Sequence, residues 1–368
     1  MIKSQVALLC LVFGLTICSV SGGNICQALV LEAGGDKGAY EVGVLDILIN
    51  NAKNPQDVHW DVVAGVSIGA INTGYISQFA IGDEVTMIGN MKTLWESITS
   101  ADIYQSWTGG MVQGILFESS VFDESPVKPF LEKYITKPPQ RPIRISATDA
   151  NQGEYITFDE NLSVDDLRTV MRSSSAVPVV FPYVNYKNYT FMDGGVINCL
   201  NLGAAINACR DRVDSDKDIY VDVVLDDYTA ALNPVNSDDD SAFSILSRAF
   251  SIMYYYNSIE LLIEAQAEFP NINFRYTVAP SQSLPTGTLP LGFKHDEILQ
   301  MIAIGQKDGL AAIQKGYGVS HQEFIAKAKS SLKGLKRQAQ KAASAILKES
   351  LKEEARKIYE EQIKSLEL

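Results

Sequence analysis

A serine between two glycines is the first feature of the chain that suggests chemistry. Gly65-Val66-Ser67-Ile68-Gly69 has the GxSxG form and lies between the apolar run 61–64 and a helix-like segment, 70–79. A sharp strand-to-helix turn of this kind exposes a serine side chain at the carboxyl end of a strand, where it can attack a carbonyl carbon. The positive end of the helix dipole favours partial alkoxide character at Ser67. The pattern predicts a nucleophile, and the structural alternative is a tight turn with a capping serine.

A glycine-rich loop precedes this serine by one strand and one helix. Ala33-Gly34-Gly35-Asp36-Lys37-Gly38 follows the apolar run 27–32 and opens a segment of helical spacing, 38–50. Such a loop turns backbone N–H groups toward one point and can hold a negative oxygen. A dinucleotide-binding G-x-G-x-x-G loop would need a glycine at Ala33 and an acidic residue at a strand end, whereas Asp57 falls in a polar loop. We therefore expect an oxyanion hole.

A carboxylate follows a third strand-like run. Asp193-Gly194-Gly195 comes directly after residues 189–192. An aspartate at a strand end, with glycines leaving space beside it, can reach a nucleophile on a neighbouring strand. The structural alternative is an Asp-Gly turn, which is the commonest use of that dipeptide.

The three histidines offer few candidates for the base that a hydrolase serine normally requires. His59 precedes the strand that leads to Ser67, so eight residues of extended chain, roughly 20 Å or more, separate the two. His321 begins a Lys-rich helical segment and is expected at the surface. His295 alone could complete a Ser–His–Asp triad, which leaves a direct carboxylate base as the favoured reading.

The three motifs, in this order, resemble the patatin-like phospholipase family from about Ala28 to Ala312. The resemblance lies in GGDKGAYEVGVL at 34–45, AGVSIGAIN at 64–72, MDGGV at 192–196 and, more weakly, RSSSAVPVVFPYV at 172–184. It implies that Ser67 is the nucleophile and Asp193 the base. It also places Gly34, Gly35 and the backbone of Asp36 in the oxyanion loop, with Lys37 in the family's basic position. Ala33 departs from the family, in which a glycine is usual.

The resemblance implies a lipid acyl hydrolase of the phospholipase A or esterase type that works through an acyl-enzyme. Its remaining motif positions, Gly38, Gly65, Gly69, Gly194 and Gly195, would shape the turns around the dyad. The substrate would be a phospholipid or another acyl-ester lipid. No metal and no cofactor are required, so we expect activity to survive chelation. The alternatives are an acyltransferase or general esterase on the same dyad, and a catalytically silent lipid-binding protein of the same fold.

Strand-like and helical segments alternate along the chain, which is typical of a three-layer α/β/α fold with a mainly parallel central sheet. The strand candidates are 27–32, 61–64, 143–147, 155–158, 189–192, 219–225 and 273–278. We expect a patatin-like domain over 26–315 and a C-terminal helical extension over 320–368. The amphipathic spacing of the extension indicates packing on its own domain or on another copy, with membrane-surface docking as the alternative.

Residues 80–140 interrupt the alternation. They contain Trp95, Trp107, Met111 and Ile115 among glycines. One interpretation is an excursion that caps the sheet with a small core of its own. The other is a lid or a lipid-contacting surface over the site.

Composition narrows the function classes. An apolar fraction of 46% with 20% charged residues indicates a globular protein with a substantial core, and the net charge of −13 argues against a nucleic-acid partner. Residues 1–22 combine Lys3, an apolar run and small residues near the end, and the run is short for a membrane span of about 20 residues. A cleaved signal peptide is therefore favoured over a retained anchor, and the predicted location is outside the cell or in an endomembrane lumen.

Cleavage would leave three cysteines, Cys26, Cys199 and Cys209. Three cysteines in an oxidising compartment permit one bridge and one free thiol. Cys199 and Cys209 are about 15 Å apart if they share a helix, so they cannot bridge each other. The sequence leaves open which of them pairs with Cys26, and it does not indicate an oligomeric state.

Overall fold

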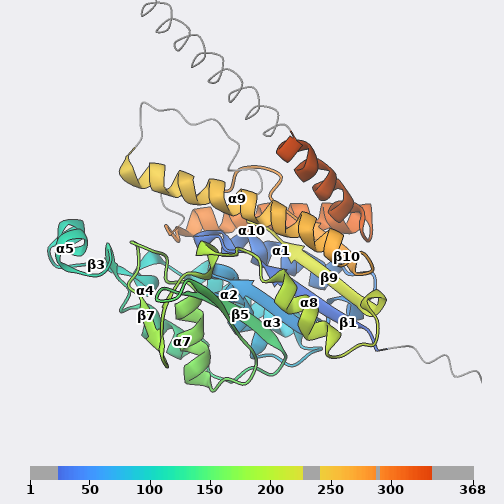
Figure 1. Ribbon diagram of the computed structural model, residues 1–368, viewed down its shortest axis with the longest axis horizontal. Helices are drawn as coiled ribbons and strands as arrows, with labels where there is room; N and C mark the ends of the chain where they lie inside the picture. Colours follow the sequence, from blue (N-terminus) through green and yellow to red (C-terminus); the bar gives the residue numbers. More distant parts are fainter. Residues whose placement is uncertain (1–23, 227–240, 287–290, 334–368) are drawn as a thin grey trace, which may run out of the picture.

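The computed structural model describes residues 24–226, 241–286 and 291–333. Within these ranges eight strands form one sheet in the order β10-β9-β1-β2-β5-β8-β7, with β6 paired to β5 (Figure 1). Their bounds are β1 Cys26–Leu31, β2 Val62–Val66, β5 Ile143–Asp149, β6 Glu154–Phe158, β7 Val184–Tyr186, β8 Tyr189–Met192, β9 Ile219–Val224 and β10 Asn273–Val278. A separate ribbon pairs β3 (Gln105–Ser106) with β4 (Phe122–Asp123).

The central part of the sheet is parallel. Strand β1 pairs with β2 on one edge and with β9 on the other, and β2 continues to β5. The residues of β1 and β2 are buried without exception, as expected for strands covered on both faces. Strands β6, β7 and β8 are antiparallel additions, so the predicted mainly parallel sheet is confirmed.

Helices cover both faces and complete three layers. Leu29 and Leu31 of β1 join one apolar core, whereas Ala28 and Val30 join the other. The first core packs α1 (Gly38–Asn51), α2 (Ile68–Ser77), α3 (Glu84–Ser97), α6 (Val127–Tyr134), α7 (Val164–Ser174) and α10 (His295–Lys315). The second packs α8 (Leu202–Arg210), α9 (Ala242–Glu268) and a helix over residues 319–333. The predicted three-layer α/β/α fold is therefore present.

Two strands share one edge of β5 and run toward each other. Strand β2 pairs in parallel with residues 143–146, and β8 pairs in antiparallel with Thr148 and Asp149. Because β6 occupies the opposite edge at Thr148 and Asp149, β8 must use the edge that β2 leaves. The carboxyl ends of β2 and β8 therefore meet near the middle of β5.

The excursion between residues 80 and 140 does not form a core of its own. Met87, Met91 and Trp95 of α3 are buried in the same core as α1 and α2, so that interpretation was wrong. The other buried apolar side chains of the excursion, among them Ile98, Val127 and Leu131, belong to this same core. Beyond α3, the short helices α4 (Ser100–Ile103) and α5 (Gly110–Phe117) lie on either side of strand β3, and α5 stands outside the layers in Figure 1.

The start of the C-terminal extension packs on the domain. Phe324, Ile325 and Ala328 are buried in the second core, beside α8 and α9. The predicted surface position of His321 was wrong, because its ring is buried and stacks on Phe274 at 4.3 Å between centroids. The rest of the extension, from residue 334, and the predicted signal peptide lie outside the described residues.

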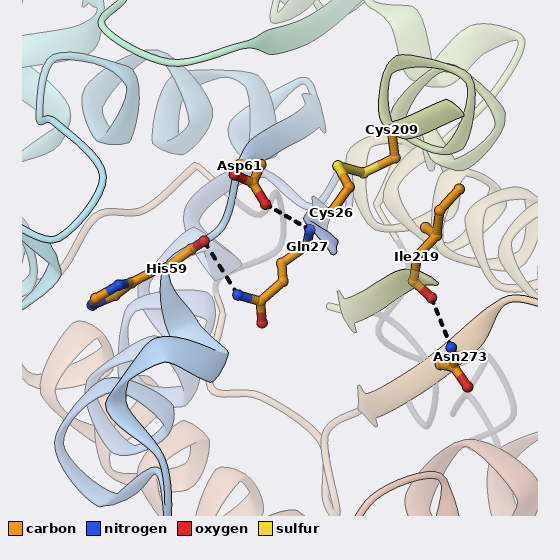
Figure 2. Close-up of a disulfide and its surroundings, with 7 residues drawn as sticks. All are labelled: Cys26, Gln27, His59, Asp61, Cys209, Ile219 and Asn273. Atoms are coloured by element: carbon orange, nitrogen blue, oxygen red, sulfur yellow. Dashed lines mark hydrogen bonds between the residues drawn. A yellow bond between two sulfur atoms is a disulfide. The ribbon is translucent and has the colours of Figure 1, made fainter. Parts of the chain in front are cut away.

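A disulfide joins the first strand to helix α8. Cys26 bonds to Cys209, and the buried Cys199 lies outside the disulfide, which resolves the pairing that the sequence left open. Figure 2 shows this bridge at the amino end of the parallel strands, beside the start of β9 and β10. Among the described helices, none combines the length and the apolar character that a membrane crossing needs.

Candidate active site

The turn at Ser67 has the backbone of a nucleophile elbow. Strand β2 ends at Val66, α2 begins at Ile68, and Ser67 between them adopts φ 54° and ψ −120°. Positive φ in a non-glycine residue is strained and persists only where the surroundings impose it. A Cβ on Gly65 would collide with the Gly69 carbonyl, and one on Gly69 would press on β1. Both glycines of the motif are therefore needed for α2 to pack this closely.

A second serine holds this turn in place. The Ser67 N–H donates to Ser174 Oγ at 2.9 Å, and the Ser174 hydroxyl donates to the Ser146 carbonyl at 2.6 Å. Ser174 is fully buried at the end of α7. No local pattern marks Ser174 in the sequence, although it lies in the serine-rich segment 172–184 of the family resemblance.

Asp193 lies at the end of β8, where the strand approaches Ser67. Its carboxyl group is fully buried, its Oδ1 accepts the Gly195 N–H at 2.7 Å, and its own N–H donates to the Ala176 carbonyl at 2.8 Å. Burial raises the pKa of Asp193 to about 7, while the nearby Ser67 hydroxyl and the Gly195 N–H lower it. Oδ2 accepts no hydrogen bond of ordinary geometry from the described residues, so this oxygen has the capacity to take a proton.

The glycine of the Asp-Gly dipeptide allows β8 to approach β5. A Cβ on Gly194 would collide with the Ser146 carbonyl, and one on Gly195 would lie 3.0 Å from Asp193 Oδ1. The dipeptide opens a short 3₁₀ turn, Gly194–Val196, so the expected Asp-Gly turn is present as well. The same turn therefore also places the Asp193 carboxylate beside Ser67.

The glycine-rich loop begins a helical segment beside Ser67, since Gly34 and Gly35 line the same cavity as the serine. Gly35 has φ +67°, and Gly34 leaves no space for a side chain because Asp226 packs against it. Residues Gly35–Lys37 form a 3₁₀ turn that continues into α1 at Gly38. The first N–H groups of a helix have no acceptor from a preceding turn, so they are available to an anion.

Ala33 fits the loop without strain. Its methyl group is buried against Val66 and Tyr254, its φ is negative, and its N–H donates to the Cys199 carbonyl at 3.1 Å. The departure from the family's glycine therefore leaves the geometry of the following residues intact.

Asp36 joins the loop to the segment that precedes α10. Its Oδ2 accepts the Gly292 N–H at 2.9 Å, and burial raises the pKa of its carboxyl group to about 6. Leu291 and Phe293, on either side of Gly292, form part of the wall around Ser67. The side chain of Asp36 is thus a structural link, separate from the backbone role that the resemblance implies for it.

Two cavities meet at Ser67. The larger one also reaches Gly35 and is lined by the apolar side chains Ile68, Ile71, Leu94, Trp95, Ile98, Ile103, Val127, Phe130, Leu131, Ile135, Met171, Val177, Phe181, Leu291 and Phe293. The smaller one lies between the glycine loop and α9, and its lining includes Lys37, Ser247, Ser251 and Tyr254. The apolar character of the larger cavity fits a hydrocarbon chain, and hydroxyl groups are more prominent in the smaller one.

A buried polar network holds the wall of the larger cavity. Asn72 donates to Glu41 at 2.6 Å and accepts the Trp95 indole N–H at 3.0 Å, which connects α1, α2 and α3. Burial raises the pKa of Glu41 well above its ordinary value, which favours the neutral form of its carboxyl group. Sequence reasoning missed this network because its members are far apart along the chain.

The histidines lie away from Ser67. Figure 2 shows His59 at the amino end of the strands, where its carbonyl faces Gln27, as the sequence geometry predicted. His295 is exposed at the start of α10 and bonds to the Glu96 carbonyl at 2.9 Å. His321 bonds to Thr277 on β10. Among the described residues, no cluster of His, Cys, Asp and Glu could hold a metal ion.

Comparison with known families decides the assignment. Residues 29–206 match the profile of the patatin-like phospholipase family, a range that contains the glycine loop, Ser67 and Asp193. The chain carries a patatin-like phospholipase domain. At the family level it is a lipid acyl hydrolase.

Comparison with individual proteins adds no detail about the site. No curated protein matches the sequence. A search of solved structures finds VipD from Legionella pneumophila, which is 11% identical with a TM-score of 0.38 over 80% of this chain and 67% of that one. This likeness is too low to bear on the site. The family match ends inside α8, so α9, which lines the smaller cavity, and Leu291 and Phe293 of the larger cavity lie beyond it.

Proposed function

We propose that this patatin-like domain cleaves fatty-acyl esters by transferring the acyl group to Ser67, with Asp193 as general base. The observation that carries the proposal is the convergence of β2 and β8 on one edge of β5, which brings the carboxylate close to a serine that lines an apolar cavity. The absence of a histidine beside Ser67 among the described residues favours a dyad over a triad.

The first half-reaction forms the acyl-enzyme. Ser67 Oγ attacks the ester carbonyl as Asp193 accepts its proton, and the N–H groups of Gly34, Gly35 and Asp36 stabilise the oxyanion. The tetrahedral intermediate then expels the alcohol, which takes the proton back from Asp193. A carboxyl group with a pKa of about 7 suits both steps, since it is a stronger base than an ordinary aspartate and is still ionised near neutral pH.

The second half-reaction releases the fatty acid. Water attacks the acyl-enzyme carbonyl, Asp193 accepts the water proton, and collapse of the intermediate returns it to Ser67 Oγ. An acyltransferase would replace water by an alcohol in this step, with the same dyad.

The two cavities suggest how an acyl-ester lipid lies in the site. We assign the larger, apolar cavity to the acyl chain and the smaller one, beside Lys37 and α9, to the alcohol part of the ester. Burial of an acyl chain contributes about 0.8 kcal/mol per methylene, so the larger cavity would supply most of the binding free energy.

The proposed location of the protein is an oxidising compartment, either outside the cell or in an endomembrane lumen. The Cys26–Cys209 bridge supports this, because structural disulfides form and persist in such compartments.

Labelling with a fluorophosphonate probe tests the function. The wild type should be labelled and Ser67→Ala should not, while Asp193→Asn should be labelled at least a hundred-fold more slowly. Equal labelling of Ser67→Ala, or no labelling of the wild type, would leave the silent lipid-binding protein as the better description. A panel of phospholipids and simple esters, with water or an added alcohol as acceptor, then separates phospholipase, esterase and transferase.

A further inference from the structure

Helix α5 carries an apolar surface that projects from the body of the molecule. Five of its eight residues are exposed apolar side chains: Met111, Val112, Ile115, Leu116 and Phe117, the last with 79% of its area exposed. Figure 1 shows the helix beyond the three layers, at the end of the β3–β4 ribbon. An apolar group of this density on one short element is unusual for a surface that faces only water.

The pattern of side chains favours lipid as the medium that covers this helix. At roughly 100° per residue the five positions spread around more than half of the circumference, whereas a helix that docks in a protein groove needs one apolar face. The fifteen residues 103–117 contain no charged side chain. Gln113 is the one polar side chain in the helix.

The polar groups at the ends of the helix are already paired internally. Gln113 accepts the Gly109 N–H at 2.7 Å and donates to Glu118 at 2.7 Å. The Trp107 indole N–H donates to the Ser120 carbonyl at 3.0 Å. Because unpaired polar groups are costly in hydrocarbon, this pairing lowers the free energy of transferring the helix into the acyl region of a lipid layer.

The base of the β3–β4 ribbon contacts residues that line the cavity at Ser67. Tyr104, at the base of the ribbon, donates to the Leu291 carbonyl at 3.0 Å and packs on Phe122 and Phe181, and both Leu291 and Phe181 line the larger cavity. On the other side of the ribbon, the Val121 N–H donates to the carbonyl of Val179, whose side chain is 58% exposed. A lipid layer in contact with α5 would therefore lie on the side of the molecule where Phe181 and Leu291 line the larger cavity.

We propose that α5 inserts into the surface of a lipid layer and holds the entrance of the larger cavity against it. The inference rests on the proposed function only in its choice of lipid as the covering medium. Since the chain is acidic and residues 103–117 carry no cation, attachment is hydrophobic and needs no anionic lipid.

Sedimentation with phosphatidylcholine vesicles tests the proposal, with Ser67→Ala as the parent protein so that no lipid is consumed. The double change Leu116→Ser and Phe117→Ser should lower vesicle partitioning at least ten-fold. The matched control, Val85→Ser with Leu299→Ser, removes two exposed apolar side chains from α3 and α10 and should change it less than two-fold. Raising the salt from 0.1 to 1 M should not weaken binding.

An independent measurement follows the helix itself. Phe117→Trp should show a blue-shifted emission with vesicles and quenching by brominated acyl chains. Unchanged partitioning of the α5 variant, loss of binding at high salt, or no quenching would overturn the proposal. So would a dimer of the parent protein that dissociates in the α5 variant while vesicles remain unbound. Hydrolysis of a monomeric short-chain ester by the wild type reports separately on the proposed function, so either idea can fail alone.

Discussion

At the scale of single residues, the proposed dyad ties the pH range of activity to the protonation of Asp193. Its carboxyl group is fully buried, and its pKa of about 7 lies well above the ordinary value of an aspartate. The raised pKa means that folding favours the protonated form. The contribution of Asp193 to the free energy of unfolding is therefore fully present below about pH 4 and is lost as the pH rises through about 7. Over the same range the carboxyl group ionises and becomes able to accept a proton.

We expect kcat/KM for a soluble ester to rise with pH through about 7 and then level off, because only ionised Asp193 can accept the Ser67 proton. Asp193→Asn should lose turnover at least a hundred-fold and, at pH 8, should melt several degrees above the wild type, with a smaller difference at pH 4. A pH–rate profile and thermal unfolding at both pH values check this. A flat profile between pH 5 and 8 would contradict it.

The hydroxyl of Ser174 should act on the reaction through the backbone of Ser67. Ser174→Ala leaves the Ser67 N–H without its acceptor, and an unpaired buried group costs about 1–3 kcal/mol, so we expect kcat to fall about ten-fold or more with little change in KM. Ser173→Ala is the control, because the Ser173 hydroxyl bonds only within its own helix, to Thr169. Equal effects of the two changes would assign Ser174 a merely structural role.

Residue-level prediction from the sequence was possible where the chemistry leaves a local pattern. The placement of Ser67 and Asp193 beside each other was anticipated because each lies in a short motif at a strand end. Ser174 and the Asn72–Trp95 contact were not, since each joins residues that are distant in sequence and carries no local signature.

At the scale of elements, strand direction was the information that the sequence lacked. All seven strand candidates are present, but nothing in the apolar runs distinguished the antiparallel β6 and β8 from the parallel strands. Strand β7, with three residues, was missed because so short a run shows no periodicity. The small core expected within residues 80–140 was wrong for a related reason, as spacing alone does not reveal which core a helix joins.

The two cavities make a prediction about acyl-chain preference. Val127→Phe, on α6, should shorten the larger cavity and lower the ratio of activity on sixteen-carbon over four-carbon esters, by roughly four-fold per methylene excluded. Val180→Phe adds the same volume beside the smaller cavity and should leave that ratio near the wild-type value. A chain-length series with matched thermal unfolding checks both. If only Val180→Phe lowered the ratio of long-chain to short-chain activity, the acyl chain would belong in the smaller cavity and the alcohol part in the larger one.

At the scale of the whole molecule, the Cys26–Cys209 bridge closes a loop across most of the family domain. The two cysteines are 183 residues apart, and the bridge fixes the first strand of the sheet to a helix of the second core. The sequence narrowed the pairing to two possibilities. The position of Cys209 on α8, facing the start of β1, decided it, and that orientation required the fold.

Removal of the bridge should destabilise the protein. In the chain-entropy account a loop of this length contributes about 5 kcal/mol, and measured losses are about 2–5 kcal/mol, so Cys26→Ser with Cys209→Ser should lower Tm by several degrees. Dithiothreitol should lower the Tm of the wild type similarly and leave the double variant unchanged. If dithiothreitol left the Tm of the wild type unchanged, the Cys26–Cys209 pairing would be contradicted.

The shared edge of β5 has a consequence for how the site tolerates change. Strands β2 and β8 approach along β5 from opposite ends. Their pairing with β5 therefore fixes the distance between Ser67 and Asp193. One residue added within β8 would move Asp193 by about 3.4 Å and turn its side chain to the other face of the sheet. Insertions in the loop after β5 would leave that spacing untouched. Length variation across relatives should therefore accumulate in such loops, while the residue counts of the two converging strands stay constant.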